Sequence, residues 1–218
     1  ELARLAGECR VGGMLGGKPG ILHLHLGDGA RGLDLVFRII RETEIPCTQI
    51  IPTHCNRNPD LLDAAFEFAA EGGRIDFTAG IGEHEPSMTV EKAVRLAVAK
   101  GAALDRISVS SDANGSLPVF DHEGHLTGLG VGSQKALLEQ LRAIVNGGVL
   151  GLARVIPLFT TNPAGFYGLE RKGRVAPGAD ADLMFLDRDL ELVHLLARGR
   201  RAVTNGEVVL RGTFSNLD

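Results

Sequence analysis

One order of elements recurs along most of this sequence: a short apolar run, a loop and an amphipathic helix. Apolar runs bounded by turn residues predict four strands, at residues 20–26, 48–53, 74–79 and 107–111. Apolar residues at helical spacing predict the helices after them, at residues 33–44, 59–71, 89–100 and 133–145, and the second of these is predicted to be capped by Asn58 with Pro59 in its first turn. Strands that alternate with helices of this length predict parallel βαβ units, so the chain is restricted to an α/β fold.

Four such units make half of an eight-stranded barrel. The polar residues that suit chemistry follow the predicted strands, and barrel enzymes place their active sites at the carboxyl ends of their strands. A doubly wound open sheet is the rival architecture, but no Gly-x-Gly-x-x-Gly fingerprint follows any of these strands. We therefore predict half of a TIM-like (β/α)8 barrel over residues 1–172, with a long loop between the fourth strand and residue 133.

The composition changes after a further predicted helix at residues 151–159. Short β segments are predicted at Val175 and at residues 182–186, 192–197, 201–204 and 207–211. An Asn-Gly pair at residues 205–206 lies between two of them and is a strong hairpin signal. Residues 173–218 are therefore predicted to form a small β unit that needs strands from elsewhere to complete its sheet.

The composition excludes several classes of protein. With 44% hydrophobic and 23% charged residues among 218, the chain is expected to fold, and a net charge of −4 argues against a nucleic acid partner. No apolar run approaches the roughly 20 residues of a membrane-spanning helix, so no membrane partner is expected. Three cysteines fit neither a disulfide framework nor a zinc ribbon, which favours a cytoplasmic location. The first residue is Glu1 rather than Met, and we expect sequence to be missing upstream.

Three candidate metal ligands follow three of the predicted strands. His25 ends the first strand, His54 the second and Asp112 the fourth. Imidazole nitrogens and carboxylate oxygens are the ligands of hydrolytic zinc sites, and neighbouring strand ends bring such groups together. A single histidine at a strand end is more often a structural residue, but three candidate ligands at equivalent strand ends favour a metal site.

His23 and His25 form a His-x-His pair on one face of the first strand, because side chains alternate along a strand. Such a pair could supply two metal ligands from the first strand of a barrel. Here only three further βα units separate the pair from the terminal β segment, so this strand cannot be the first of eight. We predict that His25 alone is a ligand and that His23 is structural, one layer deeper.

Two further residues are candidates for substrate binding. Arg57 lies three residues after His54, in a loop that leads into a helix, where a guanidinium suits a carboxylate. Ser116 ends a run of small hydrogen-bonding residues, 110–116, around Asp112. A solvated arginine and ordinary turn chemistry are the plainer interpretations. Cys55 has no evident base beside it, and three loop histidines, His84, His122 and His125, are expected to face solvent.

Four segments resemble bacterial isoaspartyl dipeptidases, which belong to the amidohydrolase superfamily. They are residues 11–20 (Val-Gly-Gly-Met-Leu-Gly-Gly-Lys-Pro-Gly), 25–28 (His-Leu-Gly-Asp), 52–58 (Pro-Thr-His-Cys-Asn-Arg-Asn) and 110–116 (Ser-Ser-Asp-Ala-Asn-Gly-Ser). Residues 173–183 look like the stretch where amidohydrolase chains leave the barrel for their β-sandwich, which identifies the superfamily only. The resemblance implies barrel strands five to eight followed by the carboxyl-terminal part of a small β-sandwich.

The resemblance also implies the roles of residues. His25 and His54 match the histidine ligands of strands five and six, and Asp112 matches a metal ligand and proton shuttle on strand eight. Arg57 and Ser116 match residues that hold the charged ends of a β-aspartyl dipeptide. The implied cofactor is two Zn²⁺ ions, and a hydroxide held by zinc attacks the amide carbonyl. A homo-oligomer is also expected.

The first half of such an enzyme is not in this sequence. Its strand-one His-x-His pair and the carboxylated lysine that bridges the two zinc ions would lie there, and we expect that half to be a partner of this chain. Alone, the chain should be inactive and should expose strand edges. Two alternatives stay open: another amidohydrolase, such as a dihydroorotase- or hydantoinase-like cyclic amidase or a deacetylase, and an inert fragment or scaffold subunit.

Overall fold

The computed structural model describes residues 1–81, 87–121, 123 and 125–212. These fall into two compact units, Glu1–Gly168 and Leu169–Asp218. The predicted boundary between residues 172 and 173 lies close to this division. None of the helices in the described part of the chain is both long and apolar enough to cross a membrane.

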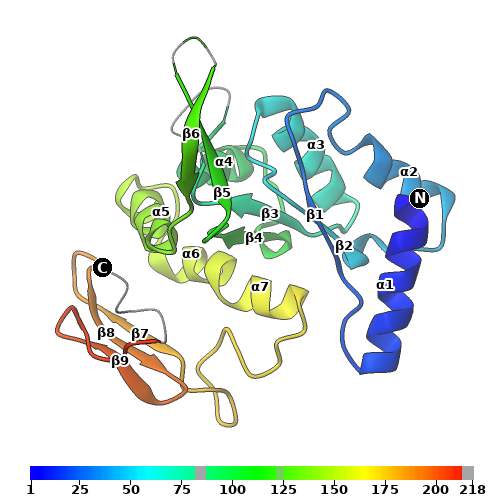
Figure 1. Cartoon of the computed structure of the whole chain (residues 1–218). Coiled ribbons are helices and arrows are strands. Elements are labelled where there is room, and N and C mark those ends of the chain that lie inside the picture. Colours follow the sequence, from blue (N-terminus) through cyan, green and yellow to red (C-terminus); the bar gives the residue numbers. More distant parts are fainter. Residues whose placement is uncertain (82–86, 122, 124, 213–218) are drawn as a thin grey trace. The chain divides into compact units, whose positions relative to one another are not determined.

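The first unit repeats the predicted order of strand and helix (Figure 1). Its elements in chain order are α1 (Leu2–Gly16), β1 (Leu22–His25), α2 (Asp34–Glu42), β2 (Ile50–Thr53), α3 (Pro59–Ala70), β3 (Ile75–Thr78), α4 (Val90–Ala99), β4 (Ile107–Ser110), β5 (Ser116–Phe120), β6 (Leu126–Val131), α5 (Lys135–Asn146), α6 (Leu152–Phe159) and α7 (Thr161–Phe166). One-turn 3₁₀ helices at Cys47–Gln49 and Leu104–Arg106 lead into β2 and β4. The four predicted strands and their helices are therefore present.

Local sequence explains where these helices begin and end. The Asn58 side chain accepts a hydrogen bond from Leu61 N at 2.8 Å, with Pro59 in the first turn of α3, so the predicted cap is confirmed. Thr89 caps α4 in the same way through Lys92 N. Gly101, with a φ of 67°, closes that helix because a left-handed residue after the last turn favours glycine.

The four parallel strands pair in two ladders. β1 pairs with β2 and β3 pairs with β4, both in parallel register. β2 and β3 are joined differently, by the bond from Cys55 N to Asp76 O at 3.2 Å and by side-chain hydrogen bonds. The parallel pairing of these strands confirms the mixed α/β fold. The two ladders do not close into a barrel, so the half-barrel interpretation stays a prediction.

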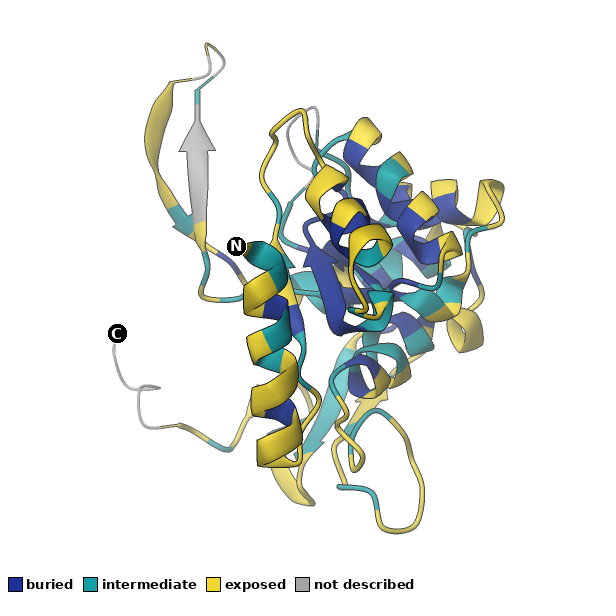
Figure 2. Cartoon of the chain, turned by 90° about the vertical axis from the view of Figure 1, so that its right-hand side faces the viewer, coloured by how far each residue is buried: buried dark blue, intermediate teal, exposed yellow. Residues whose placement is uncertain are grey.

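The core of the first unit lies between the parallel strands and the helices, where Figure 2 shows buried strands beneath helices with exposed outer faces. All four residues of β2 and of β3 are buried. The largest buried side chains include Phe68, Ile51 and Phe77, each contributing roughly 1.5–3 kcal/mol by burial. β1 differs, because Leu22 is buried whereas His23 and His25 are exposed.

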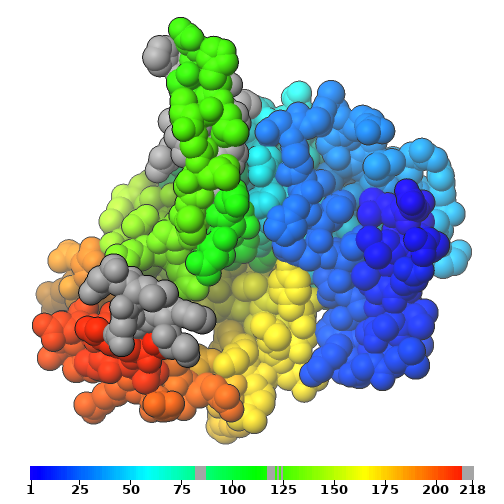
Figure 3. Space-filling model, viewed as in Figure 1, coloured from blue at the N-terminus to red at the C-terminus, as the bar shows by residue number. Residues whose placement is uncertain are grey.

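An antiparallel hairpin replaces the long loop that we predicted after the fourth strand. β5 pairs with β6 between residues 116 and 131 and extends away from the helices of the first unit (Figure 3). Gly128, Gly130 and Pro118 lie within these strands, and such residues are depleted from strands, so the sequence is typical of a loop. The prediction of a loop was therefore wrong, because the pairing of β5 with β6 forms strands in spite of these residues.

The second unit is a four-stranded antiparallel sheet in the order β10-β9-β8-β7. Its strands are β7 (Leu183–Leu186), β8 (Leu192–Ala197), β9 (Arg200–Thr204) and β10 (Glu207–Val208). The predicted Asn-Gly hairpin is confirmed, because Asn205 and Gly206 both have positive φ, 51° and 80°, between β9 and β10. The predicted β segment at Val175 is wrong, since that residue is exposed and outside any strand. A β-sandwich stays a prediction.

Candidate active site

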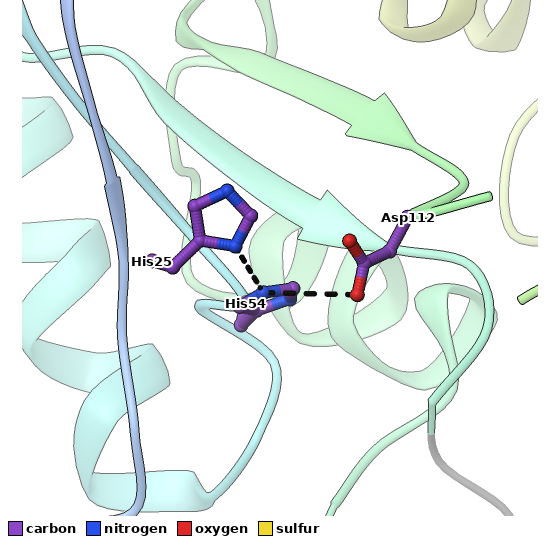
Figure 4. A group of neighbouring side chains, drawn as sticks. All are labelled: His25, His54 and Asp112. Carbon is purple, nitrogen blue, oxygen red and sulfur yellow. Dashed lines mark hydrogen bonds and ion pairs between the residues drawn. The ribbon is translucent and has the colours of Figure 1, made fainter. Parts of the chain in front are cut away.

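The structure brings His25, His54 and Asp112 together (Figure 4). His25 is the last residue of β1, His54 directly follows β2, and Asp112 lies two residues after β4. His25 Nδ1 lies 2.9 Å from His54 Nε2, and His54 Nε2 lies 3.9 Å from Asp112 Oδ2. One ligand atom from each residue lies within 4.8 Å of the others.

The backbone turns sharply at two of these residues. His54 and Asp112 have φ values of 63° and 50°, in the left-handed region that a residue with a side chain adopts at a cost. Just before each turn the ladders are intact, with Leu26 N donating to Thr53 O and Ala79 N to Ser110 O. The chain therefore leaves regular strand geometry where the two candidate ligands face each other.

His54 is held with one ring nitrogen toward the group. Its side chain is buried, and Nδ1 lies 2.7 Å from Thr78 Oγ1 on β3, which leaves Nε2 facing His25 and Asp112. Burial and, next, the positive charge of Arg57 lower the pKa of His54 to about 4, although Asp112 opposes this shift. The imidazole is therefore neutral near pH 7, which is the form that binds a metal.

The three donors fit a divalent ion such as zinc. Zinc–ligand bonds of about 2.0–2.1 Å in a tetrahedral arrangement separate two ligand atoms by about 3.3 Å. The separations of 2.9 Å between His25 Nδ1 and His54 Nε2 and of 3.9 Å between His54 Nε2 and Asp112 Oδ2 lie on either side of this value. Two imidazole nitrogens and a carboxylate oxygen are also a common zinc donor set.

The hairpin fixes the loop that carries Asp112. Asn114 N donates to Gly132 O at 3.0 Å, and Gly132 N donates to Gly115 O at 3.0 Å. Gly115 N closes the turn on Asp112 O at 2.9 Å. A Cβ atom at Gly132 would collide with Asp112 O, so the end of β6 packs directly against the Asp112 backbone.

Arg57 lies in the turn after His54, with its backbone N donating to His54 O at 3.0 Å. Its Nη1 lies 3.6 Å from Asp28 Oδ2, and its side chain is 27% exposed. Its Nε is buried and has no hydrogen-bond partner among the described residues. Ser116, four residues after Asp112, is exposed at the start of β5 and pairs with Val131.

His23 also lies beside the group. Its ring centroid is 5.0 Å from that of His25, and its Nδ1 lies 2.7 Å from the hydroxyl of Tyr167. Burial, followed by the neighbouring His25, lowers the pKa of His23. A structural role for His23 stays a prediction, and its exposure does not fit a deeper layer.

The remaining sequence candidates lie elsewhere. Cys55 is fully buried, and burial raises the pKa of its thiol, as expected for an inert cysteine. His125 is exposed beside Asp121 and Glu123, where the three side chains form a second group of ligand atoms. His84 and His122 lie outside the described residues.

Sequence reasoning missed the polar residues beneath the candidate ligands. Asp76 and Thr78 lie on β3 and are buried, as is Asn56, whose side chain bonds Thr78 N at 2.8 Å and Thr78 O at 3.1 Å. A signal was present, since Ile-Asp-Phe-Thr places a lone carboxylate inside a buried strand.

The family of the chain follows from comparison with known proteins. Residues 59–210, which include Asp112 and most of the βα units, match the model of the amidohydrolase family. The chain belongs to the amidohydrolase family.

Two solved structures of a β-aspartyl dipeptidase from Fervidobacterium islandicum AW-1 are similar to the chain. One, in complex with β-Asp-Leu dipeptide, is 39% identical with a TM-score of 0.86, and the other is 34% identical with a TM-score of 0.82. Both alignments cover 97% of this chain, but only 55% and 53% of those chains. This amidohydrolase chain therefore spans about half the length of those relatives.

Curated relatives with other activities match shorter parts of the chain. A dihydroorotase from Halobacterium salinarum is 42% identical over 133 residues, which are 61% of this chain and 24% of that protein. An adenine deaminase from Bacillus velezensis is 44% identical over 54 residues, which are 24% of this chain and 9% of that protein.

Proposed function

We propose that the chain is part of a metal-dependent hydrolase that cleaves β-aspartyl dipeptides. The observation that carries the proposal is the convergence of His25, His54 and Asp112 at the ends of parallel strands. Its specificity is supported by 39% identity, over 97% of the chain, to a β-aspartyl dipeptidase whose structure holds β-Asp-Leu. Parallel strand ends are also where α/β enzymes gather groups that act on a substrate.

His25 Nδ1, His54 Nε2 and a carboxylate oxygen of Asp112 would hold the metal, for which we propose zinc. When bound, such an ion acidifies a water molecule and polarises the amide carbonyl. We extend the proposal to two zinc ions per complete site, with a bridging carboxylated lysine that this chain does not contribute.

Asp112 would move the proton. Its side chain is 24% exposed, so both water and a substrate can reach it. The carboxylate accepts a proton from the attacking water and then donates it to the leaving amine, acting as a general base and then as a general acid.

Arg57 would bind a carboxylate of the dipeptide. Its side chain is partly exposed and, among the described residues, meets one carboxylate, Asp28, at 3.6 Å, which leaves donors for a second carboxylate. The hydroxyl of Ser116 would bind the other charged end of the dipeptide. These contacts select peptides with free termini.

The activity is proposed for a complete amidohydrolase fold. The chain spans only 55% of the dipeptidase whose structure holds β-Asp-Leu, so the rest of the fold would come from further polypeptide, the partner expected above. A homo-oligomer in the cytoplasm stays part of the proposal.

A cyclic amidase is the second candidate, favoured by the 42% identity to a dihydroorotase over 133 residues. The test uses the complete enzyme, in which this chain is joined by the rest of its amidohydrolase fold, and compares the activity of the zinc-loaded enzyme on β-Asp-Leu and on dihydroorotate. Cleavage of β-Asp-Leu that falls at least about 100-fold in Arg57→Ala, with zinc content unchanged, supports the dipeptidase. Turnover of dihydroorotate without cleavage of β-Asp-Leu would instead support the cyclic amidase. Absence of bound zinc would favour an inert scaffold.

A further inference from the structure

Asp76 is a buried carboxylate in the middle of β3, below the candidate metal ligands. It is 2% exposed and forms no ion pair with any residue that the structure describes. Three hydroxyl groups donate to it instead: Thr53 and Ser110 bond Oδ2, and Ser108 bonds Oδ1, each at 2.6 Å. A buried charge is costly unless hydrogen bonds compensate it, and the three hydroxyl groups provide this compensation for Asp76.

The charge state of Asp76 supports this arrangement. Burial raises its pKa to about 6, and the hydrogen bonds from Ser108, Ser110 and Thr53 limit the rise. The carboxylate is therefore ionised near pH 7. An ionised carboxylate only accepts hydrogen bonds, so all three hydroxyls must point at it.

The partners of Asp76 lie next to the candidate ligands along the chain. Thr53 immediately precedes His54, and Ser110 lies two residues before Asp112. The backbone oxygen of Asp76 also accepts a hydrogen bond from the residue after His54, Cys55 N, at 3.2 Å. One residue of β3 thus contacts both sides of His54 and the segment that leads to Asp112.

Some of these contacts join β2 to β3, two neighbouring strands that no backbone ladder pairs. β2 belongs to one two-stranded ladder and β4 to another, so the position of His54 relative to Asp112 depends on what joins β2 to β3. The bond from Thr53 to Asp76 spans this junction, whereas the bond from Ser108 joins β3 and β4, which a ladder already pairs.

The backbone of both ligands needs such support. His54 and Asp112 each adopt a left-handed φ, and strained residues of this kind persist only where their surroundings hold them. A small shift between β2 and β4 would change the separation of 3.9 Å between His54 Nε2 and Asp112 Oδ2.

We propose that Asp76 is a positioning residue that, through Thr53 and Ser110, sets the spacing between His54 and Asp112 for one divalent ion. The inference rests on the proposed function of these two residues as metal ligands. Asp76 does not itself bind the ion and acts through the strands on either side of it.

The test compares hydroxyl deletions that each remove one hydrogen bond to Asp76. Thr53→Val removes the bond across the junction, and Ser108→Ala removes a bond of the same length within the β3–β4 pair. Zinc affinity of the purified protein, measured by competition with a chromophoric chelator, should fall about 10-fold or more in Thr53→Val, the range for groups that orient metal ligands. It should change less than about twofold in Ser108→Ala.

Rescue separates positioning from general destabilisation. Thr53→Ser restores the hydroxyl and should restore the affinity. Asp76→Asn should lower the affinity at least as much as Thr53→Val. Equal losses in Thr53→Val and Ser108→Ala, or no loss in either, would overturn the inference.

A metal-free measurement keeps the inference separate from the proposed function. If the wild-type protein binds no zinc, the proposed function fails. Crystal structures of the metal-free variants then decide the inference: the separation of His54 Nε2 and Asp112 Oδ2 should exceed 3.9 Å in Thr53→Val and stay at that value in Ser108→Ala. An unchanged separation in Thr53→Val would contradict it.

Discussion

His54 Nε2 faces Asp112 Oδ2 at 3.9 Å, and both residues have left-handed backbone conformations. Left-handed residues with side chains cost about 1–3 kcal/mol each. Because the two conformations lie at the ends of β2 and β4, they turn the imidazole and the carboxylate toward each other. The strain is thus placed where a metal ion would offset it.

Asp112→Asn should remove the proposed general base with little change in fold. Asparagine has the same shape and tolerates positive φ, so the melting temperature should stay within a few degrees. Hydrolysis of β-Asp-Leu by the zinc-loaded complete enzyme should fall by at least about 100-fold. Steady-state rates beside thermal unfolding curves check this, and wild-type rates in the variant would remove Asp112 from the mechanism.

Gly132→Ala, at the end of the β5–β6 hairpin, should displace Asp112 and weaken zinc binding. The added Cβ would collide with Asp112 O, whereas a Cβ at Gly128, within β6 four residues earlier, meets nothing within 4 Å. Zinc affinity should therefore fall in Gly132→Ala and stay unchanged in the matched control Gly128→Ala. Isothermal titration with zinc measures both, and equal affinities would show that the hairpin does not position Asp112.

Thr78→Val should loosen His54 without touching its Nε2. Thr78 Oγ1 lies 2.7 Å from His54 Nδ1, and partners of this kind fix the ring of a ligating histidine. Zinc affinity should fall about 10- to 100-fold and recover in Thr78→Ser, which keeps the hydroxyl. An affinity that tracks thermal stability rather than the presence of the hydroxyl would contradict this role.

In the metal-free protein, the contributions of Asp76 and His54 to the free energy of unfolding should change with pH in opposite directions. The pKa of Asp76 is raised to about 6, so its contribution is fully present below its ordinary value of 3.8 and is lost as pH rises through about 6. The pKa of His54 is lowered to about 4, so its contribution is present above 6.5 and is lost as pH falls through about 4.

Asp76→Asn removes the first of these contributions. The free energy of unfolding of the variant should then rise with pH between 4 and 6.5 more steeply than that of the wild type, by up to roughly 3 kcal/mol over this range. Urea unfolding at several pH values, with a chelator present, measures the difference. Parallel curves for the two proteins would contradict a raised pKa at Asp76.

The sequence predicted the elements whose signals are local. Asn58 with Pro59 marked the start of α3, and Asn205 with Gly206 marked the last hairpin, because capping and turn geometry depend on adjacent residues. Short apolar runs bounded by turn residues located the parallel strands, and this signal is also local. His25, His54 and Asp112 were selected because parallel strands end at one edge of a sheet.

Features that depend on distant contacts were not predicted. Gly128 and Gly130 suggest a loop, yet pairing with β5 makes them part of a strand. α7 contains Pro163 and Gly165, which have low helix propensity, so its sequence does not predict the helix that tertiary contacts stabilise. Asp76 was overlooked because the hydroxyls that compensate it come from two other strands, at residues 53, 108 and 110.

Location of the metal by anomalous diffraction at the zinc edge tests the central claim most directly. Crystals of the zinc-loaded protein should show a peak about 2.0–2.2 Å from His25 Nδ1, His54 Nε2 and a carboxylate oxygen of Asp112. A peak only beside Asp121, Glu123 and His125, or no peak in crystals soaked with zinc, would contradict the account.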